Sequence, residues 1–366
     1  MITTAIFPGR YVQGAGAIEH SLAEELSRLG RKALILEDPV VHQKLGPQIN
    51  SALQGKIAYQ VEVFNSECSD EEIERISALA QHYGAEVIVG IGGGKTLDTA
   101  KATGAALKRP IAIVPTLAST DAPCSSLVVI YTSQGQFKRY LMIPRNPDVV
   151  LVDSMVIAQA PVRFLLSGIG DALATWFEAE DCRIKMAGNM TGRPGPMSAY
   201  GLARLCYDTL LKYGALAKVA CEQQKVTPAL EHVIEANTLL SGLGFESGGL
   251  AAAHAIHNGL TVLPQTHHYW HGEKVTFGVL AMLMLTDREP EVIDTVYRFC
   301  GELGLPTTLA DIGLSDVSDG DLMRVAQAAC QQGETIHNEP HEITPDNVLA
   351  ALRAADAEGR KRLALA

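Results

Sequence analysis

Five of the eleven histidines lie within one stretch of 18 residues, at positions 254, 257, 267, 268 and 271. His254 and His257 are three positions apart in a run of small residues that favours a helix, so their rings share one helix face. His271 follows a short turn. One helix and the next could therefore present two imidazoles to a single point, which is the commonest way to hold a transition metal in a protein.

A third metal ligand would be a carboxylate from elsewhere in the chain, and Asp171 is the best candidate. Each of these residues also has a simpler interpretation. Asp171 could cap the N-terminus of its helix, and His257 could be a core histidine bonded to a backbone carbonyl, the interpretation that we favour for it. His267 and His268 are interpreted as loop residues. Spacing alone therefore leaves the metal site and the simpler interpretations open.

A second candidate site is the segment 86–98, where an apolar run of strand length ends in Gly92, Gly93 and Gly94 and a helical pattern begins at Lys95. Glycines allow the backbone to approach an anion closely, and the N–H groups and dipole of a helix start favour negative charge. We expect the pyrophosphate of a nucleotide cofactor to bind there. A glycine-rich turn without a ligand is the simpler alternative.

Two standard phosphate-binding fingerprints nearly match this turn, and both fail. A P-loop that ends at Gly94-Lys95-Thr96 would need glycine at position 89, which is valine. The dinucleotide fingerprint G-x-G-x-x-G, started at Gly90, places Lys95 where its last glycine belongs. The spacing therefore disfavours a P-loop-like nucleotide-binding protein.

The elements that must position these residues change character along the chain. Up to about residue 152, apolar runs rich in Val and Ile alternate with helical patterns, which predicts an α/β domain with a mostly parallel sheet. An α+β domain without a nucleotide site is the alternative. The expected strands cover 32–37, 59–64, 86–90, 111–114, 127–131 and 149–152, and the expected helices cover 18–29, 70–83 and 95–107.

After Pro161 almost no alternating segments remain, and the periodicity predicts an all-helical domain. We therefore expect an α/β nucleotide-binding domain over residues 1–161 and an all-helical, metal-binding catalytic domain over 162–366. The stretch 187–197, with three Gly and two Pro, is expected to be a surface loop. The expected helices cover 170–186, 198–213, 228–245, 248–262, 273–285, 289–303, 318–332 and 344–363.

The bulk composition excludes several classes of partner. Among the 366 residues, 30 Lys and Arg face 41 Asp and Glu, and the resulting charge of −11 argues against nucleic acid or an anionic membrane as partner. The seven scattered cysteines form no C-x-x-C pair, which is typical of a reducing compartment. The N-terminus lacks a signal-peptide pattern and no apolar run suits a bilayer span. We therefore expect a soluble, cytoplasmic protein.

Four separated motifs together resemble the glycerol dehydrogenases, a branch of the iron-containing alcohol dehydrogenase superfamily, along essentially the whole chain. The motifs are GGGKTLDTAK at 92–101, PTLASTDAP at 115–123, GIGDALATW at 168–176, and HAIHNG at 254–259 with HGEK at 271–274. The resemblance implies a dehydroquinate synthase-like fold with an active site between an α/β domain and a helical domain. It also implies a homo-oligomer, an octamer being one possible assembly.

The resemblance implies that NAD binds with its pyrophosphate on Gly94 and Lys95. Further family positions around the cofactor match Asp98, Thr116, Thr120, Ser125, Leu127 and Tyr131. Glu37, at the end of an early strand, matches the acidic position near the adenosine ribose, where the family more often has Asp. An acid there accepts hydrogen bonds from ribose hydroxyls and repels a 2′-phosphate, which favours NAD over NADP.

Asp171, His254 and His271 match the metal ligands of the family, and Asp121 matches a position that faces the substrate. The iron enzymes of the superfamily carry a further histidine one helical turn after the aspartate, where this chain has Thr175. Three ligands and one open position suit catalytic zinc, so we expect Zn²⁺ rather than Fe²⁺. His257 and Asp121 are candidate proton carriers.

The implied reaction is the oxidation of glycerol to dihydroxyacetone with NAD⁺ as the hydride acceptor, with related 1,2-diols also accepted. The metal would lower the pKa of the substrate hydroxyl. The nearest alternative is a hydroxycarboxylate, 2-oxo acid or phosphorylated-polyol dehydrogenase on the same fold, which would need free cations in the active site. Lys138, Arg139 and Arg163 are the candidates for that role. A metal-binding member that has lost catalysis is a further alternative.

Overall fold

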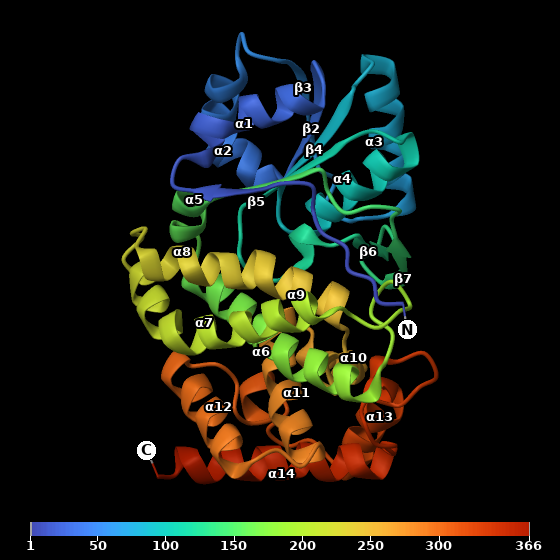
Figure 1. The fold of residues 1–366 in the computed structure, drawn as a ribbon, viewed down its shortest axis with the longest axis vertical. Helices are drawn as coiled ribbons and strands as arrows, with labels where there is room; N and C mark the ends of the chain where they lie inside the picture. The colour runs from blue at the N-terminus through green and yellow to red at the C-terminus, as the bar shows by residue number, and fades with distance from the viewer. Residues whose placement is uncertain (1, 366) are drawn as a thin grey trace. The chain divides into compact units, whose positions relative to one another are not determined.

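The computed structural model describes residues 2–365, and the chain divides into two compact units. The sheet unit comprises Ile6–Val162 and Ala220–Leu239, and the helical unit comprises Met1–Ala5, Arg163–Val219 and Leu240–Ala366. Figure 1 shows the elements of both. The expected domain boundary between residues 161 and 162 stays a prediction.

The sheet unit contains a six-stranded sheet with the order β1-β8-β5-β4-β2-β3, in which every neighbouring pair is parallel. This confirms the predicted α/β class with a mostly parallel sheet. The chain order reverses between β2 and β4, and ligands of such sheets bind at the carboxyl ends of the strands at this reversal. The strands are β1 (Tyr11–Gly14), β2 (Lys32–Glu37), β3 (Ala58–Val63), β4 (Val87–Gly92), β5 (Ile111–Pro115) and β8 (Val149–Asp153).

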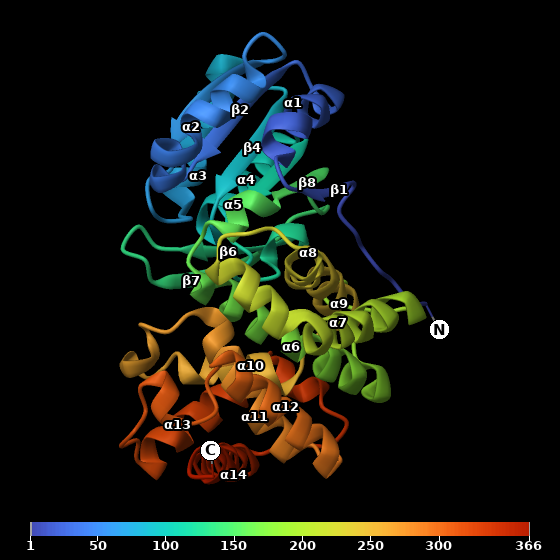
Figure 2. The same cartoon turned by 90° about the vertical axis from the view of Figure 1, so that its left-hand side faces the viewer.

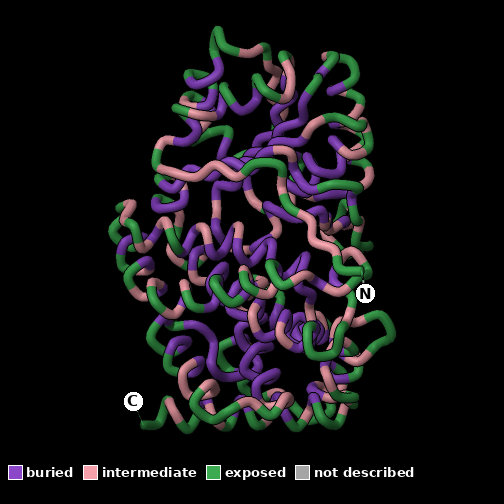
Figure 3. The backbone as a smooth tube through the Cα atoms, in the orientation of Figure 1, coloured by how far each residue is buried: buried purple, intermediate pink, exposed green. Residues whose placement is uncertain are grey.

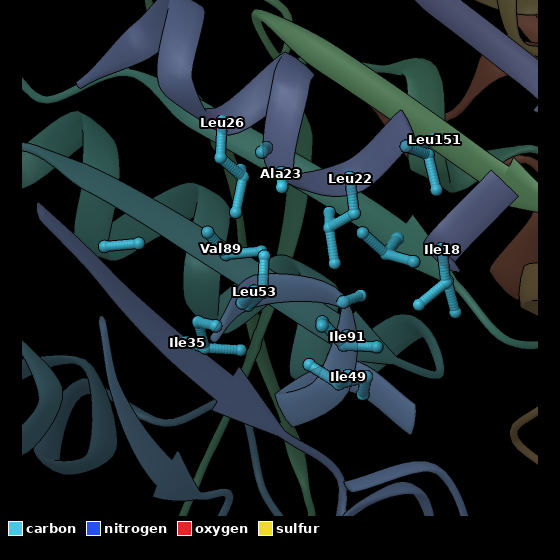
Figure 4. Packing of buried hydrophobic residues seen from close by; sticks show 14 of the residues in the cluster. Ile18, Leu22, Ala23, Leu26, Ile35, Ile49, Leu53, Val89, Ile91 and Leu151 are labelled. Atoms are coloured by element: carbon cyan, nitrogen blue, oxygen red, sulfur yellow. The ribbon is translucent and has the colours of Figure 1, made fainter. Parts of the chain in front are cut away.

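The central strands are buried on both faces because helices cover both faces (Figures 1 and 3). Figure 4 shows one of these cores, where Leu22 and Leu26 of α1 and Leu53 of α2 pack on Ile35 and Val89 of the sheet. Continuous apolar strands of this kind are typical of parallel sheets. The helices of this part are α1 (Ala17–Leu29), α2 (Pro39–Leu53), α3 (Asp70–Tyr83), α4 (Gly94–Leu107) and α5 (Ser154–Ala158).

One expectation about this unit needs correction, and some of its elements were not predicted. β6 (Leu127–Tyr131) forms a strand as predicted, but it pairs antiparallel with β7 (Phe137–Met142) in a separate hairpin instead of joining the sheet. Its burial alternates along the strand, as in a strand with one covered face. The helix α2 was not predicted from the sequence, because Gly46 and Pro47 interrupt its apolar pattern.

The segment Ala220–Leu239 carries α8 (Pro228–Glu235), which is tied to the sheet unit through one carboxylate. Glu231 accepts hydrogen bonds from the side chains of Gln13 in β1 and Ser154 in α5, both at 2.6 Å. Contacts of this kind between residues far apart in sequence explain why periodicity alone did not associate α8 with the sheet.

The helical unit, also seen in Figure 2, confirms the predicted helical remainder of the chain. Its helices are α6 (Val162–Lys185), α9 (Ser241–Gly248), α10 (Ala252–Leu260), α11 (His271–Leu285), α12 (Pro290–Leu303), α13 (Asp319–Ala329) and α14 (Pro345–Leu363), together with most of α7 (Met197–Glu222). Among the described residues, none of the helices combines the length and the apolar character needed to span a membrane.

The helix expected over 228–245 is instead interrupted by a π-helical turn, Ala236–Leu240, between α8 and α9. α9 ends at Gly248, and the next residue, Gly249, has a φ of +113° and donates its N–H to the carbonyl of Phe245. Glycine reaches this conformation at little cost. α10 therefore begins at Ala252, later than the predicted residue 248.

Candidate metal and coenzyme sites

In the helical unit, Asp171 of α6, His254 of α10 and His271 of α11 converge, with one potential ligand atom from each within 4.8 Å of the others. The Nε2 atoms of His254 and His271 lie 3.3 and 3.1 Å from the same oxygen, Oδ1 of Asp171. Asp171 is fully buried, whereas the His271 side chain is 37% exposed. The cluster therefore has a closed end at the aspartate and an accessible end at His271.

Glycines allow the three helices to approach closely enough to form this cluster. A Cβ atom on Gly170, beside Asp171, would overlap Thr276 and the backbone of Gly272 in α11. A Cβ on Gly278 of α11 would likewise overlap the carbonyl of Ala253, beside His254. Each of the three candidate ligands therefore has a chain neighbour that lies at a close contact between two helices. This packing holds the backbone of the ligand residue in place.

Glu178 supports His254 from the side opposite to Asp171. It lies two turns after Asp171 in α6, is fully buried, and its Oε2 atom lies 2.6 Å from Nδ1 of His254. Its Oε1 atom accepts the backbone N–H groups of His254 and Ala251 at the start of α10. Glu178 therefore sets both the ring orientation and the helix start. We did not predict this role, although the spacing of seven from Asp171 could have indicated a shared face.

His271 has a different support, because its Nδ1 atom lies 3.0 Å from Nε2 of the buried His257. The Nδ1 atom of His257 in turn lies 3.1 Å from Oδ1 of Asn258, whose amide donates to Glu334 at 3.0 Å. Burial, and then the nearby His271 and Lys274, lower the pKa of His257 well below its ordinary value. His257 is therefore neutral, with one nitrogen available to accept from His271.

The charges of the cluster are coupled. Burial raises the pKa of Asp171, but the nearby His271 and His254 outweigh burial and hold it below its ordinary value. Burial lowers the pKa of His254, but Glu178 and then Asp171 outweigh it and raise that pKa well above its ordinary value. A cation that binds here must displace a proton from His254, as is general for imidazole ligands.

This donor set fits a divalent transition metal. One carboxylate oxygen and two Nε2 atoms face one another, and the Nδ1 atom of each imidazole is engaged by the protein, which is how metal-ligating histidines are usually held. Burial of the fixed charge on Asp171 also favours a cation as its partner.

The candidate coenzyme residues lie in the sheet unit, around the reversal of strand order. Glu37 ends β2, and the register pairs it with Ile91 of β4, directly before the glycine turn. Glu37 is 1% exposed. Its Oε2 atom lies 2.7 Å from Nδ1 of His42, and its Oε1 atom is buried without a hydrogen-bond partner among residues 2–365. A buried carboxylate oxygen of this kind fits a ligand hydroxyl as its donor.

Glycine stands at each of the positions 90, 92 and 94 for a different structural reason. A Cβ on Gly90 would lie 2.7 Å from Cβ of Ala100, so this glycine lets α4 pack closely on β4. A Cβ on Gly92 would lie 2.8 Å from Cβ of Asp38. Around Gly94, in contrast, an added Cβ would meet no described atom within 4 Å beyond its chain neighbours and the backbone of its own helix. The helix start at Gly94 therefore borders open space, which fits the close approach of a phosphate group.

The remaining predicted coenzyme residues lie beyond β5 and along β6. Thr116 and Thr120 follow β5, Ser125 follows a short 3₁₀ turn, and Leu127 and Tyr131 are the two ends of β6. The nearby Asp98 is 6% exposed, and both of its oxygens contact the protein, one at 2.9 Å from Nζ of Lys101 and one at 2.9 Å from the N–H of Val129. In this structure Asp98 holds β6 in place, and its contact with a coenzyme stays a prediction.

Lys101 is a residue of this site that sequence reasoning missed. It is fully buried, and its ammonium group donates to the carbonyls of Ala122, Ser125 and Leu127 at 3.1, 3.2 and 2.7 Å. It therefore ties α4 to the segment that carries several predicted coenzyme residues. Its position in the motif at 92–101 was visible, but a buried lysine cannot be recognised without the fold.

Asp121 lies in the same segment of the sheet unit and is 8% exposed. It precedes the 3₁₀ turn Ala122–Cys124, but its side chain makes no capping hydrogen bond to that turn. Its position directly before this turn still fits the simpler interpretation, a turn former before Pro123. Its contact with the substrate stays a prediction.

The three cationic side chains that could bind an anionic substrate each form an ion pair with a carboxylate of the same structural unit. Asp70 accepts from Arg139 at 2.6 and 2.9 Å and from Lys138 at 2.7 Å, and these hydrogen bonds hold the pKa of Asp70 below its ordinary value. Arg163 forms a two-bond contact with Glu273 at 2.6 and 2.9 Å. Arg163 is therefore matched by one carboxylate of its own, whereas Lys138 and Arg139 share the single carboxylate of Asp70.

Comparison with known proteins identifies the family of the chain. The profile of the family "Iron-containing alcohol dehydrogenase" matches residues 8–154. The chain is 64% identical to glycerol dehydrogenase of Thermotoga maritima, an alignment that covers 99% of both chains. It is also similar to a solved glycerol dehydrogenase from Schizosaccharomyces pombe, at 39% identity and a TM-score of 0.94, over 98% of this chain and 92% of that one. A probable glycerol dehydrogenase from Sinorhizobium meliloti matches at 46% identity and a TM-score of 0.92, over 98% of this chain and all of that one. The chain is therefore an oxidoreductase that belongs to the iron-containing alcohol dehydrogenase family, in its glycerol dehydrogenase branch.

Proposed function

We propose that this protein oxidises glycerol and related 1,2-diols, with NAD⁺ as the hydride acceptor and a divalent metal held by Asp171, His254 and His271. The overall change is glycerol plus NAD⁺ to dihydroxyacetone, NADH and a proton. The observation that carries the proposal is the convergence of these three side chains, each imidazole held by a second contact. When bound, the metal would acidify the substrate hydroxyl and the nicotinamide would accept the hydride.

The residues of the chain have separate roles in this proposal. Asp171 supplies the fixed negative charge, and Glu178 and His257 hold the two imidazoles in the orientation that directs Nε2 to the cation. In the sheet unit, Gly94 and Lys95 would receive the pyrophosphate and the Oε1 atom of Glu37 would accept from the adenosine ribose. Asp121 would accept a hydrogen bond from a second hydroxyl of the polyol.

Zn²⁺ rather than Fe²⁺ is the proposed metal. Thr175 occupies the place of the additional histidine of the iron enzymes, and its hydroxyl is bonded to Ser241 at 2.8 Å in a fully buried environment. Three protein ligands and an open position suit zinc. A polyol is favoured over an anionic substrate because all three candidate cations already contact carboxylates, Lys138 and Arg139 sharing Asp70 and Arg163 contacting Glu273.

The proposal extends to the setting in which the enzyme works. Apolar side chains exposed along α7, namely Leu205, Leu216 and Val219, support assembly into a homo-oligomer. Seven cysteines as free thiols, six of them buried among the described residues, support a reducing cytoplasm. Light scattering after size-exclusion chromatography tests the assembly.

The test of the function is NADH formation across glycerol, 1,2-propanediol, a 2-hydroxy acid and glycerol 3-phosphate. We expect turnover with the two uncharged polyols, glycerol and 1,2-propanediol, loss of activity after prolonged chelation, and recovery with Zn²⁺. Asp171→Asn should bind little metal, whereas Asp208→Asn, the same change on an exposed helix, should behave like the wild type. A protein shown to be metal-free that still oxidises glycerol at the original rate would contradict the proposal.

A further inference from the structure

Lys95, which follows the glycine turn, already has a counter-charge inside the sheet unit. Its Nζ atom lies 2.8 and 2.6 Å from the two carboxylate oxygens of Glu67. The same ammonium lies 4.6 Å from the ring centroid of Tyr131. An ammonium has three N–H donors, and the carboxylate accepts from this one with both of its oxygens.

The backbone around Glu67 is fixed, so the carboxylate is held near Lys95. The N–H of Glu67 donates to Asn65 at 3.0 Å, and its carbonyl accepts from Ser69 at 2.9 Å. The next residue, Cys68, accepts the N–H of Tyr131 at 2.8 Å. Gly135 of the hairpin lies close enough that an added Cβ would be 3.1 Å from Oε1 of Glu67. The Glu67 side chain is only 22% exposed, so water screens its charge less than that of a free surface residue.

We propose that Glu67 lowers the affinity of this protein for its dinucleotide, because its carboxylate competes with the pyrophosphate for the ammonium group of Lys95. The inference rests on the proposed function, in which Lys95 receives the pyrophosphate. Two anions that share one cation repel each other, so coenzyme binding exchanges the Glu67–Lys95 pair for a phosphate–Lys95 pair. A weakened complex releases NADH faster, and product release limits turnover in many enzymes.

The experiment measures the dissociation constant of NADH by its fluorescence, in the metal-loaded protein without glycerol. Glu67→Gln keeps the shape of the side chain and removes its charge, and we expect the dissociation constant to fall about three- to tenfold at low salt. The gain should shrink at high salt, where charges are screened. Glu74→Gln removes the same charge from an exposed position of α3 and should leave the dissociation constant unchanged.

A double-mutant cycle assigns the effect to Lys95. Lys95→Met should weaken NADH binding, and Glu67→Gln should give a smaller gain in affinity in that background than in the wild type, because only the direct repulsion between carboxylate and pyrophosphate remains. Weaker NADH binding by Glu67→Gln would overturn the inference, because Glu67 would then orient Lys95 instead of competing for it. The inference would also be overturned if Glu67→Gln raised the affinity for NADH as much in the Lys95→Met background as in the wild type.

Two further measurements keep these results interpretable. Glu67→Ala repeats the test with a smaller side chain, and thermal unfolding of each variant verifies that it is folded. A wild-type protein that binds no NADH contradicts the proposed function itself. A wild-type protein that binds NADH with the same affinity as a folded Glu67→Gln contradicts only the role of Glu67.

Discussion

Gly170 of α6 and Gly272 of α11 lie so close that a Cβ on Gly170 would overlap the carbonyl of Gly272. A Cβ on Gly272 would in turn overlap the carbonyl of Ser167, whose hydroxyl accepts the Gly272 N–H at 3.2 Å. The neighbours of these glycines in the chain are Asp171 and His271. The contact that lets the helices meet therefore also brings two of the proposed metal ligands together.

Gly272→Ala should separate α6 from α11 and weaken the metal site. The overlap is with backbone, which cannot turn aside as a flexible side chain could, so we expect a loss of stability of about 1–3 kcal/mol. We also expect a lower metal content after dialysis against Zn²⁺, measured by elemental analysis beside thermal unfolding.

Gly301→Ala in α12 is the matched control, since an added Cβ there meets no atom within 4 Å. That change should stabilise the helix by about 0.5–1 kcal/mol. If Gly272→Ala keeps its full metal content and its stability, the close contact does not position the ligands.

Thr175→His tests whether the chain can be converted to a four-ligand site. Thr175 is fully buried, and a Cβ on Gly244 would overlap its methyl group, so a larger ring has no room. We expect a loss of stability of about 1–3 kcal/mol and no gain in affinity for Fe²⁺ over Zn²⁺, measured by competition for the apo-protein. Thr175→Val, which removes only the bond to Ser241, should cost about 1 kcal/mol. A stable Thr175→His enzyme that selects Fe²⁺ would show that the pocket can expand.

Glu37→Gln tests the proposed choice of coenzyme. The change keeps the shape of the side chain but removes the charge that would repel a 2′-phosphate. We expect the ratio of kcat/KM for NAD⁺ to that for NADP⁺ to fall by about tenfold, which corresponds to ~1.4 kcal/mol. Glu19→Gln, on the exposed face of α1, is the charge-matched control. An unchanged ratio would place the ribose away from Glu37.

Glu339 should make the stability of the protein depend on pH. Burial, and then the nearby Asp181, raise the pKa of its carboxyl from 4.5 to about 9. Between these values the folded protein keeps a proton that the unfolded chain has released, so the free energy of unfolding falls as the pH rises, by at most ~1.4 kcal/mol per pH unit. The protonated carboxyl also accepts the N–H of Ala252 at 2.8 Å, at the start of α10.

Glu339→Gln imitates the protonated form and should flatten this part of the pH profile of the unfolding temperature. The exposed Glu342→Gln should keep the wild-type slope. Equal slopes in the wild type and in Glu339→Gln would mean that another group carries the dependence.

Local sequence patterns were sufficient for much of the architecture. The run 32–37 became β2 without any change of bounds, and the helix expected over 70–83 became α3. Both have strong local signals, an apolar run in the first and a Ser69 cap with an amphipathic pattern in the second. β6 shows the limit, because the run 127–131 is a strand whose partner, β7, is mostly exposed and carries a weak pattern.

The sequence by itself determined the family motifs, the glycine turn before Lys95 and the identity of Asp171, His254 and His271 as candidate ligands, because each depends on residue types at fixed spacings. Only the tertiary structure decided which side chains support or oppose them. Three contacts between different elements make this clear. They join Glu178 to His254, Lys101 to the segment of predicted coenzyme residues, and Glu67 to Lys95. Such contacts depend on how helices and strands pack, and packing is set by many residues that no local period records.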